Sequence, residues 1–326
     1  IDPSVTVNMT AVETFDVAAA NSATELVLDM AKVTGLSQIN LSDASSESIE
    51  LNNLASGVVV DVVSDNATAT TVEIKQATTS GTESQTVNVF ATEADDAIAI
   101  TMADVETLTI KPESAAQANV SLANVSMTAS ADRATVNFIG TNDVEITATN
   151  ADINTIDASG MGVGGAVIQT GRSSTEASTY TGSAGGDTFI MANVNDTIAA
   201  GAGDDTLDVN FAAILGGLAV DLSAATNQVT QIDGGNTSTV SGFEHVNAAG
   251  YTGSYGARIT GRSTKASTVT GTPQADVINF GSAVDTFVWD AAGNDVVNMG
   301  AGADIIQISD TALDALSDLA AGADID

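Results

Sequence analysis

The stretch GSAGGDTFIMANVNDTIAAGAGDDTLDV, residues 182–209, repeats one acidic position at a fixed interval. Asp187, Asp196 and Asp205 stand nine residues apart. The apolar residues found two positions after these aspartates are Phe189, Ile198 and Leu207. The surrounding glycines are typical of tight turns, and the apolar positions are typical of short strands. The stretch therefore predicts a β structure of short repeated turns, and it raises the question of what holds its carboxylates together.

A second copy of the same pattern lies further along the chain. Residues 156–171 (IDASGMGVGGAVIQTG) match residues 246–261 (VNAAGYTGSYGARITG) at an offset of 90. The match continues through a basic loop, so 153–205 and 243–304 are two copies of one module. The aspartates of the second copy are Asp276, Asp285, Asp295 and Asp304, with one step of ten residues before Asp295. We expect the apolar residues two positions after each aspartate of both copies to point inward as one row: Phe189, Ile198, Leu207, Ile278, Phe287, Val297 and Ile306.

The region upstream of these modules alternates apolar and polar residues with a period of two. Examples are TVEIKQ (71–76), TVNVFA (86–91) and ATVNFIG (134–140), separated by small and polar residues. Short strands at regular spacing indicate either a solenoid or a sandwich, and the self-similarity at about 90 residues favours the solenoid. The only helix we expect is at 309–320, with Leu313, Leu316 and Leu319 on one side.

The composition limits the classes of partner. Lysine and arginine total 8 against 42 aspartates and glutamates, which gives a formal net charge of −34. Such a charge repels phosphates and points to cations, so we expect neither nucleic-acid binding nor insertion into a membrane. With 44% hydrophobic residues the chain is not expected to be disordered. The sequence has no cysteine, no apolar run long enough to span a membrane, no initiator methionine and no signal peptide, so we expect a processed or partial segment.

Four nonapeptides carry a family resemblance: GSAGGDTFI (182–190), AGAGDDTLD (200–208), GTPQADVIN (271–279) and MGAGADIIQ (299–307). They resemble the G-G-x-G-x-D-x-U-x unit of the repeat-in-toxin, or hemolysin-type calcium-binding, family. The resemblance implies that nine residues make a turn and a strand and that two repeats make one coil of a right-handed parallel β-roll. It also implies calcium in the turns between coils, held by backbone carbonyls and by the aspartate of each repeat.

The resemblance assigns calcium ligands by position. These are Asp187, Asp196, Asp205, Asp276, Asp285, Asp295 and Asp304, with the turn glycines Gly182, Gly185, Gly203 and Gly302. Gly271 and Gly293 also fit the unit, whereas the turns before Asp196 and Asp276 lack some glycines.

Elementary electrostatics supports a cation independently. Stacked coils lie about 4.8 Å apart, and at that distance two bare carboxylates repel by roughly 3 kcal/mol at an effective dielectric near 20. A divalent cation with oxygen ligands reverses the sign of that interaction. Residues separated by two repeats occupy equivalent turns, so Asp187 should pair with Asp205, Asp276 with Asp295, and Asp285 with Asp304. The alternative is that the aspartates only form turns and keep solvated side chains.

Basic residues concentrate in the two matched loops, which hold Arg172, Arg258, Arg262 and Lys265. Two interpretations stay open: internal ion pairs or a solvated loop, and contacts to a neighbouring copy or to cell-surface polysaccharide. His245 is the single histidine, and with no cysteine the chain is poorly supplied for zinc or nucleophilic catalysis. We therefore expect no catalytic residue and no enzyme, and we interpret Trp289 as a packing residue.

The flanking sequence extends the resemblance, since residues 100–205 resemble β-helical segments that precede these repeats in bacterial surface-layer proteins and large adhesins. The resulting division is a β-rich segment 1–100, a β-solenoid segment 101–181, a first calcium β-roll 182–209, a connecting segment 210–270, a second calcium β-roll 271–308 and a terminal segment 309–326. The resemblance implies an extracellular, calcium-dependent surface-layer subunit that binds copies of itself and leaves the cell by type I secretion. The alternatives are a segment of a large calcium-dependent adhesin, and the non-catalytic repeat domain of a secreted protease, lipase or epimerase.

Overall fold

The structure is a computed structural model of the 326-residue chain. It describes all residues except 1–7, 19–25, 43–47, 65–69, 78–82, 92–96, 104, 114–119, 129–133, 147–148, 150–151, 171–176, 192–195, 211–216, 232–238, 290–292 and 309–326. The described residues form strands and turns and no helix, so the expected all-β fold is confirmed. None of them belongs to a helix long and apolar enough to cross a membrane. The helix expected at 309–320 lies outside the described residues.

The chain divides into two compact units. Unit 1 holds residues 1–173 and 177–186, and unit 2 holds residues 174–176 and 187–326. The boundary between the two units falls within residues 182–209, the stretch in which the repeated aspartates begin.

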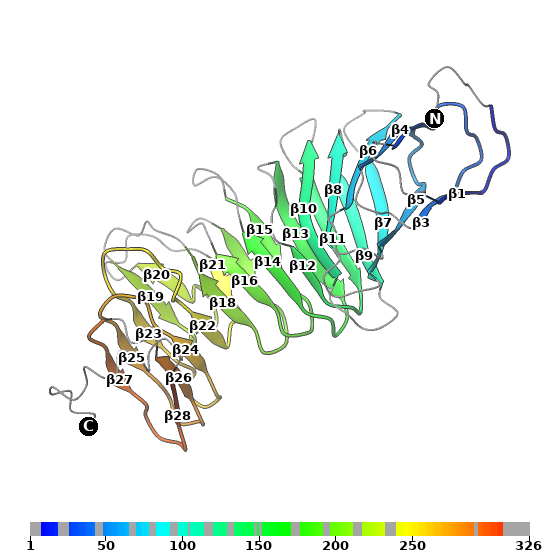
Figure 1. The fold of residues 1–326 in the computed structure, drawn as a ribbon. Coiled ribbons are helices and arrows are strands. Elements are labelled where there is room, and N and C mark those ends of the chain that lie inside the picture. The colour runs from blue at the N-terminus through cyan, green and yellow to red at the C-terminus, as the bar shows by residue number, and fades with distance from the viewer. Residues whose placement is uncertain are drawn as a thin grey trace. The chain divides into compact units, whose positions relative to one another are not determined.

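Unit 1 consists of two parallel sheets whose strands alternate along the chain (Figure 1). One sheet contains β1 (Thr14–Ala18), β3 (Gln38–Ser42), β5 (Val59–Ser64), β7 (Ser84–Ala91), β9 (Thr107–Glu113), β11 (Ala134–Gly140), β13 (Ile153–Met161) and β15 (Thr179–Thr181). The other contains β2 (Leu26–Asp29), β4 (Ile49–Leu54), β6 (Thr70–Gln76), β8 (Ala97–Ala103), β10 (Val120–Thr128), β12 (Val144–Ile146) and β14 (Ala166–Thr170). Two successive strands thus make one coil, which is the arrangement of a parallel β-solenoid.

The core of unit 1 is a set of stacked apolar rows. Register places Ile39, Val60, Val87, Ile110 and Phe138 beside one another on successive strands, and all five are fully buried. β-branched and aromatic side chains pack well on a pleated surface, which explains why alternating sequences such as TVNVFA form these strands.

Unit 2 continues the same principle with shorter strands. One parallel sheet contains β16 (Thr188–Met191), β18 (Thr206–Val209), β22 (His245–Asn247), β24 (Thr268–Thr270), β26 (Thr286–Trp289) and β28 (Ile305–Ile308). A second contains β19 (Leu218–Asp221), β20 (Val229–Gln231), β23 (Arg258–Thr260), β25 (Val277–Asn279) and β27 (Val296–Asn298), and β17 (Thr197–Ala199) pairs with β21 (Thr239–Ser241). The β20 strand runs antiparallel to β19, a feature that the expected all-parallel solenoid did not include.

Coil length distinguishes the nonapeptide regions from the rest. In unit 1 the paired residues Asp16 and Asn40 are separated by 24 positions, and the paired residues Asp61 and Asn88 by 27. In unit 2 the equivalent separation is 18 positions for Asp187 and Asp205, and 19 for Asp285 and Asp304. Two nine-residue repeats per coil explain the shorter value.

The apolar row predicted from the repeats is buried over most of its length. Phe189, Ile198, Leu207 and Ile278 are 0% exposed and Phe287 is 5% exposed. Ile306 pairs in register with Phe287 and so lies on the same face, but it is 51% exposed, and Val297 is only half-buried. The reason is position, because Ile306 lies on β28, the last strand of its sheet among the described residues.

Candidate metal centres in the turns

The acidic residues of unit 2 stack in columns at the turns. The first column consists of the residues that immediately precede β16, β18, β22, β24, β26 and β28: Asp187, Asp205, Glu244, Ser267, Asp285 and Asp304. The second column consists of those that precede β23, β25 and β27: Ala257, Asp276 and Asp295. Because parallel strands pair in register, members of a column lie one coil apart. The three expected aspartate pairs are therefore neighbours.

Each column is joined by hydrogen bonds that run from backbone to carboxylate. In the first column Oδ1 of Asp205 accepts from the backbone N–H of Asp187 at 2.8 Å, and Oδ1 of Asp304 accepts from that of Asp285 at 3.0 Å. In the second, Oδ1 of Asp295 accepts from the backbone N–H of Asp276 at 3.0 Å. One oxygen of each of these carboxylates therefore satisfies a backbone donor of the preceding coil, a role that spacing alone did not reveal.

Burial contradicts the alternative that these side chains are solvated. Asp187, Asp196, Asp205, Asp276 and Asp285 are all at most 1% exposed. Burying an ionised carboxylate is costly unless hydrogen bonds or a cation compensate it. The aspartates are therefore structural members of the turns rather than surface charges, with Asp295 and Asp304 only half-buried near the end of the columns.

Three carboxylates have one oxygen that no described residue satisfies. Within the described part of the chain, Oδ2 of Asp196, Oδ2 of Asp205 and Oδ2 of Asp285 are buried and accept no hydrogen bond, although Asp196 has other contacts. Burial raises the pKa of Asp205 to about 7. The hydrogen bond from the backbone N–H of Asp187 lowers this pKa, whereas the charges of Asp187 and Glu244 raise it further. Such an oxygen is suited to a cation, which would stabilise the ionised form.

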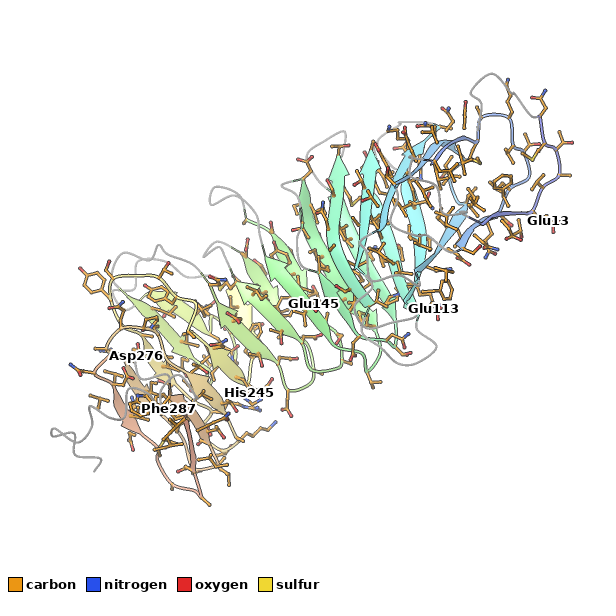
Figure 2. All side chains as sticks on the ribbon, in the orientation of Figure 1. Glu13, Glu113, Glu145, His245, Asp276 and Phe287 are labelled. Atoms are coloured by element: carbon orange, nitrogen blue, oxygen red, sulfur yellow. The ribbon has the colours of Figure 1, made fainter. Side chains whose placement is uncertain are left out.

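Asp276, which is labelled in Figure 2, differs from Asp205 and Asp285 in its hydrogen bonds. Its Oδ2 accepts from the backbone N–H of Thr272 at 2.7 Å, and its Oδ1 accepts from Thr272 Oγ1 at 2.7 Å and from the backbone N–H of Ala257 at 2.6 Å. The turn before Asp276 keeps Gly271 but has Thr272 and Gln274 where the repeat unit has glycine. Both carboxylate oxygens of Asp276 therefore have protein donors, which makes it a weaker candidate ligand than Asp205 or Asp285.

Glycines in the second roll leave room for oxygen atoms from two coils. A Cβ added to Gly302, whose φ is +148°, would lie 2.0 Å from the carbonyl oxygen of Ala283 and 2.7 Å from Asp304 Oδ1. At Gly293, with φ +83°, it would lie 2.3 Å from the carbonyl oxygen of Gln274 and 2.9 Å from Asp295 Oδ1. Calcium binds six to eight oxygens at about 2.3–2.6 Å and uses backbone carbonyls readily. A backbone carbonyl oxygen and a carboxylate oxygen thus both lie close to each of these glycines.

For the remaining predicted ligands, Asp196, Gly182, Gly185 and Gly203, the structure gives fewer contacts. Asp196 precedes β17, and the equivalent residue of the next coil, 238, lies outside the described residues. Gly182 and Gly185 belong to unit 1, and a Cβ at Gly185 would lie 2.4 Å from the carbonyl oxygen of Val163. Gly203 has φ +146°. No cluster of three or more acidic or histidine side chains suited to a metal occurs among the described residues.

Glu244 is a member of the first column that sequence reasoning missed. Its Oε2 accepts from the backbone N–H of Asp205 at 2.9 Å, as an aspartate does elsewhere in the column. The long separation between Asp205 and Glu244 hides the periodicity, because β19 and β20 lie between them. The usable signal was the acid immediately before the short strand HVN.

The basic residues of the second loop have separate surroundings. Arg262 Nη1 lies 3.3 Å from Glu244 Oε1, so this arginine forms the internal ion pair that was one of the two open interpretations. Arg258 and Lys265 are exposed, and Arg172 lies outside the described residues. His245 Nδ1 accepts from the backbone N–H of Thr268 at 2.9 Å, and burial lowers its pKa.

Comparison of the chain with protein-family models, with curated proteins and with solved structures found no match. The resemblance to calcium-binding repeats therefore rests on the nonapeptides, and support for a cation comes from the columns.

Proposed function

We propose that this chain is a calcium-dependent structural protein of the bacterial cell surface, a surface-layer subunit whose copies assemble into a lattice. The observation that carries the proposal is the stacking of buried aspartates in unit 2, with unsatisfied oxygens on Asp205 and Asp285. In the proposed sites the aspartates act together with turn carbonyls, such as that of Ala283 near Asp304 and that of Gln274 near Asp295. Bound calcium would supply the positive charge that compensates the stacked carboxylates.

A contrast between the outer sheet faces and the turns supports a cation in the turns of unit 2. In unit 1, acids on the outer face of a sheet alternate with amides: Asp16, Asn40, Asp61 and Asn88 are neighbours on successive strands. Asn88 Nδ2 donates to Asp61 Oδ1 at 2.8 Å, so an amide separates the charges. In the turns acid lies beside acid, with no amide between, in the described pairs Asp187–Asp205 and Asp285–Asp304 of unit 2. One turn pair of unit 1, Glu83 and Glu106, has the same arrangement.

Net charge connects folding with assembly. A chain with a formal charge of −34 repels its own copies. Occupied sites would reduce that charge and would make association depend on the same ion as folding. This dependence favours a protein that meets calcium outside the cell, where calcium modules bind at about 10⁻⁴ to 10⁻³ M. A calcium-dependent adhesin would share the same dependence, and it is the second candidate.

Two measurements on the purified chain test the proposal. Titration of calcium into chelated protein should increase the β signal in circular dichroism up to millimolar concentration. Negative-stain microscopy of the calcium-loaded sample should show periodic sheets. A calcium response without sheets would favour the adhesin, and no calcium response at all would refute the proposal.

A further inference from the structure

One member of the first column, Glu244, is paired with a positively charged side chain of the protein, Arg262. Glu244 lies between Asp205 and Ser267 in this column, at the junction between the first and second copies of the repeated module. Its Oε2 accepts the backbone N–H of Asp205 at 2.9 Å, and Asp205 accepts that of Asp187 at 2.8 Å. Glu244 therefore continues the column across the insertion that separates the two copies.

Arg262 makes two contacts with the first column, one through its side chain and one through its backbone. Its Nη1 lies 3.3 Å from Glu244 Oε1, and the two side chains are only 17% and 14% exposed. Its backbone N–H donates to Ser267 Oγ at 2.9 Å, and Ser267, 1% exposed, is the next member of the column. The loop between β23 and β24 is thus fixed at the column itself, and the ion pair is mostly removed from solvent, where it matters more than a surface pair.

The charges at this junction differ from those at the other positions. The pairs Asp187–Asp205 and Asp285–Asp304 place acid on acid. Glu244 also lies beside the acid Asp205, but on its other side it is followed by the neutral Ser267. The guanidinium can therefore balance the charge of Glu244 without a metal ion. The first copy of the module carries the neutral Asn154 at the equivalent position, beside buried Ser178, so the acid occurs only where the column of aspartates runs.

We propose that Arg262 takes, at the junction between the two copies, the place that calcium takes at the other acidic positions of the column. The junction is then closed by the chain's own cation and binds no calcium. The comparison with calcium rests on the proposed function, whereas the electrostatic role of Arg262 toward Glu244 does not.

A double-mutant cycle at one fixed, saturating calcium concentration tests the electrostatic role. Arg262→Met keeps most of the aliphatic stem and removes the charge, so it should lower the melting temperature of unit 2 by about 5–10 °C. Adding Glu244→Gln should recover most of that loss, because the glutamine still accepts the Asp205 N–H but carries no charge. Arg258→Met, at an exposed arginine, is the matched control and should change the melting temperature by less than about 2 °C. Equal losses in R262M and R258M, or no recovery in the double mutant, would overturn the proposal.

The calcium dependence of the same variants tests the equivalence with calcium. R262M leaves Glu244 uncompensated, so its melting temperature should rise more steeply with calcium concentration than that of the wild type. The R262M/E244Q double mutant should return to the wild-type slope. A slope in R262M equal to that of the wild type would overturn the equivalence. A wild type that ignores calcium would instead refute the proposed function, and the double-mutant cycle would still report on the ion pair.

Discussion

At the scale of single residues, Asp285 and Asp276 occupy the same place in the repeat but have different surroundings. Asp285 accepts one hydrogen bond, from the backbone N–H of Ser267 at 2.7 Å, through Oδ1, and its buried Oδ2 accepts none within the described residues. Asp276 accepts hydrogen bonds from Thr272 and Ala257 through both oxygens. One carboxylate therefore has an oxygen to offer a cation, and the other is satisfied by the protein.

This difference predicts that the same substitution has two separable effects. Asp285→Asn should raise the calcium concentration at half-saturation by about tenfold, roughly 1.4 kcal/mol, because it removes charge from a candidate ligand. Asp276→Asn should chiefly lower stability at saturating calcium by about 1–3 kcal/mol, because an amide nitrogen would face the donors of Thr272. Calcium titration and urea unfolding of both variants measure the two effects. Indistinguishable profiles would mean that general charge, rather than site geometry, controls binding.

A second residue-scale prediction concerns His245 and pH. Burial lowers the pKa of His245, which the charges of Asp204 and Glu244 oppose and that of Arg262 reinforces. The neutral ring accepts the Thr268 N–H, so the unfolded chain takes up the proton first as pH falls. The stability that His245 contributes is therefore complete above the unfolded pKa of about 6.5 and decreases as pH falls below it.

The matched variant is His245→Asn, whose side-chain oxygen can accept the same hydrogen bond without titrating. Between pH 7 and pH 5 the wild type should lose about 1 kcal/mol more stability than this variant. Urea unfolding at both pH values, at constant calcium, gives the comparison. Parallel pH profiles for the two proteins would exclude a role for His245 in acid sensitivity.

At the scale of strands, position in the sheet decides what an inward-facing residue contributes. Ile278 lies on β25 between two neighbouring strands and is 0% exposed, whereas Ile306 lies on β28 and is 51% exposed. Ile278→Ala should therefore cost about 2–5 kcal/mol, and Ile306→Ala less than about 1 kcal/mol. Denaturant unfolding of the calcium-loaded variants checks the ratio. A cost at Ile306 as large as at Ile278 would show that another part of the chain covers it.

The strands also show what the sequence could and could not predict. The nine-residue spacing of Asp187, Asp196 and Asp205 predicted the turns, and twice that spacing predicted which aspartates become neighbours, because a parallel coil converts spacing directly into register. Glu244 was missed because β19 and β20 interrupt that spacing. The antiparallel pairing of β20 was missed because strands this short carry too little pattern to define their direction. The backbone-to-carboxylate hydrogen bonds required atomic positions.

At the scale of the whole molecule, the two units should respond differently to chelation. On the outer face of a sheet, unit 1 separates stacked acids with amides, as in Asp61 and Asn88, and its row from Ile39 to Phe138 is fully buried. Its described turns include one acid pair, Glu83 and Glu106, but not the glycine-rich nonapeptides of unit 2. Unit 2 stacks acid on acid in its turns. Removing calcium from the full chain should therefore increase amide exchange by at least about tenfold in β18, β26 and β28 and should leave β5, β7 and β9 protected. Hydrogen exchange read by mass spectrometry resolves these strands. Equal deprotection of both units would refute a calcium requirement confined to unit 2.

Assembly is the last property of the whole molecule that the structure makes testable. Arg262 is engaged with Glu244, so the basic side chains of the second loop region that can meet a neighbouring copy are the exposed Arg258 and Lys265. In a lattice of acidic copies such cations provide the complementary charge, and they influence geometry and rate of association more than affinity. The double variant Arg258→Glu, Lys265→Glu should therefore disrupt periodic sheets in negative-stain images at millimolar calcium. Its circular dichroism response to calcium should remain that of the wild type, because neither side chain belongs to a column.

Lys32→Glu, at an exposed lysine of unit 1, controls for a charge reversal elsewhere and should leave the sheets intact. Normal sheets from the double variant would remove this loop region from the interface between copies.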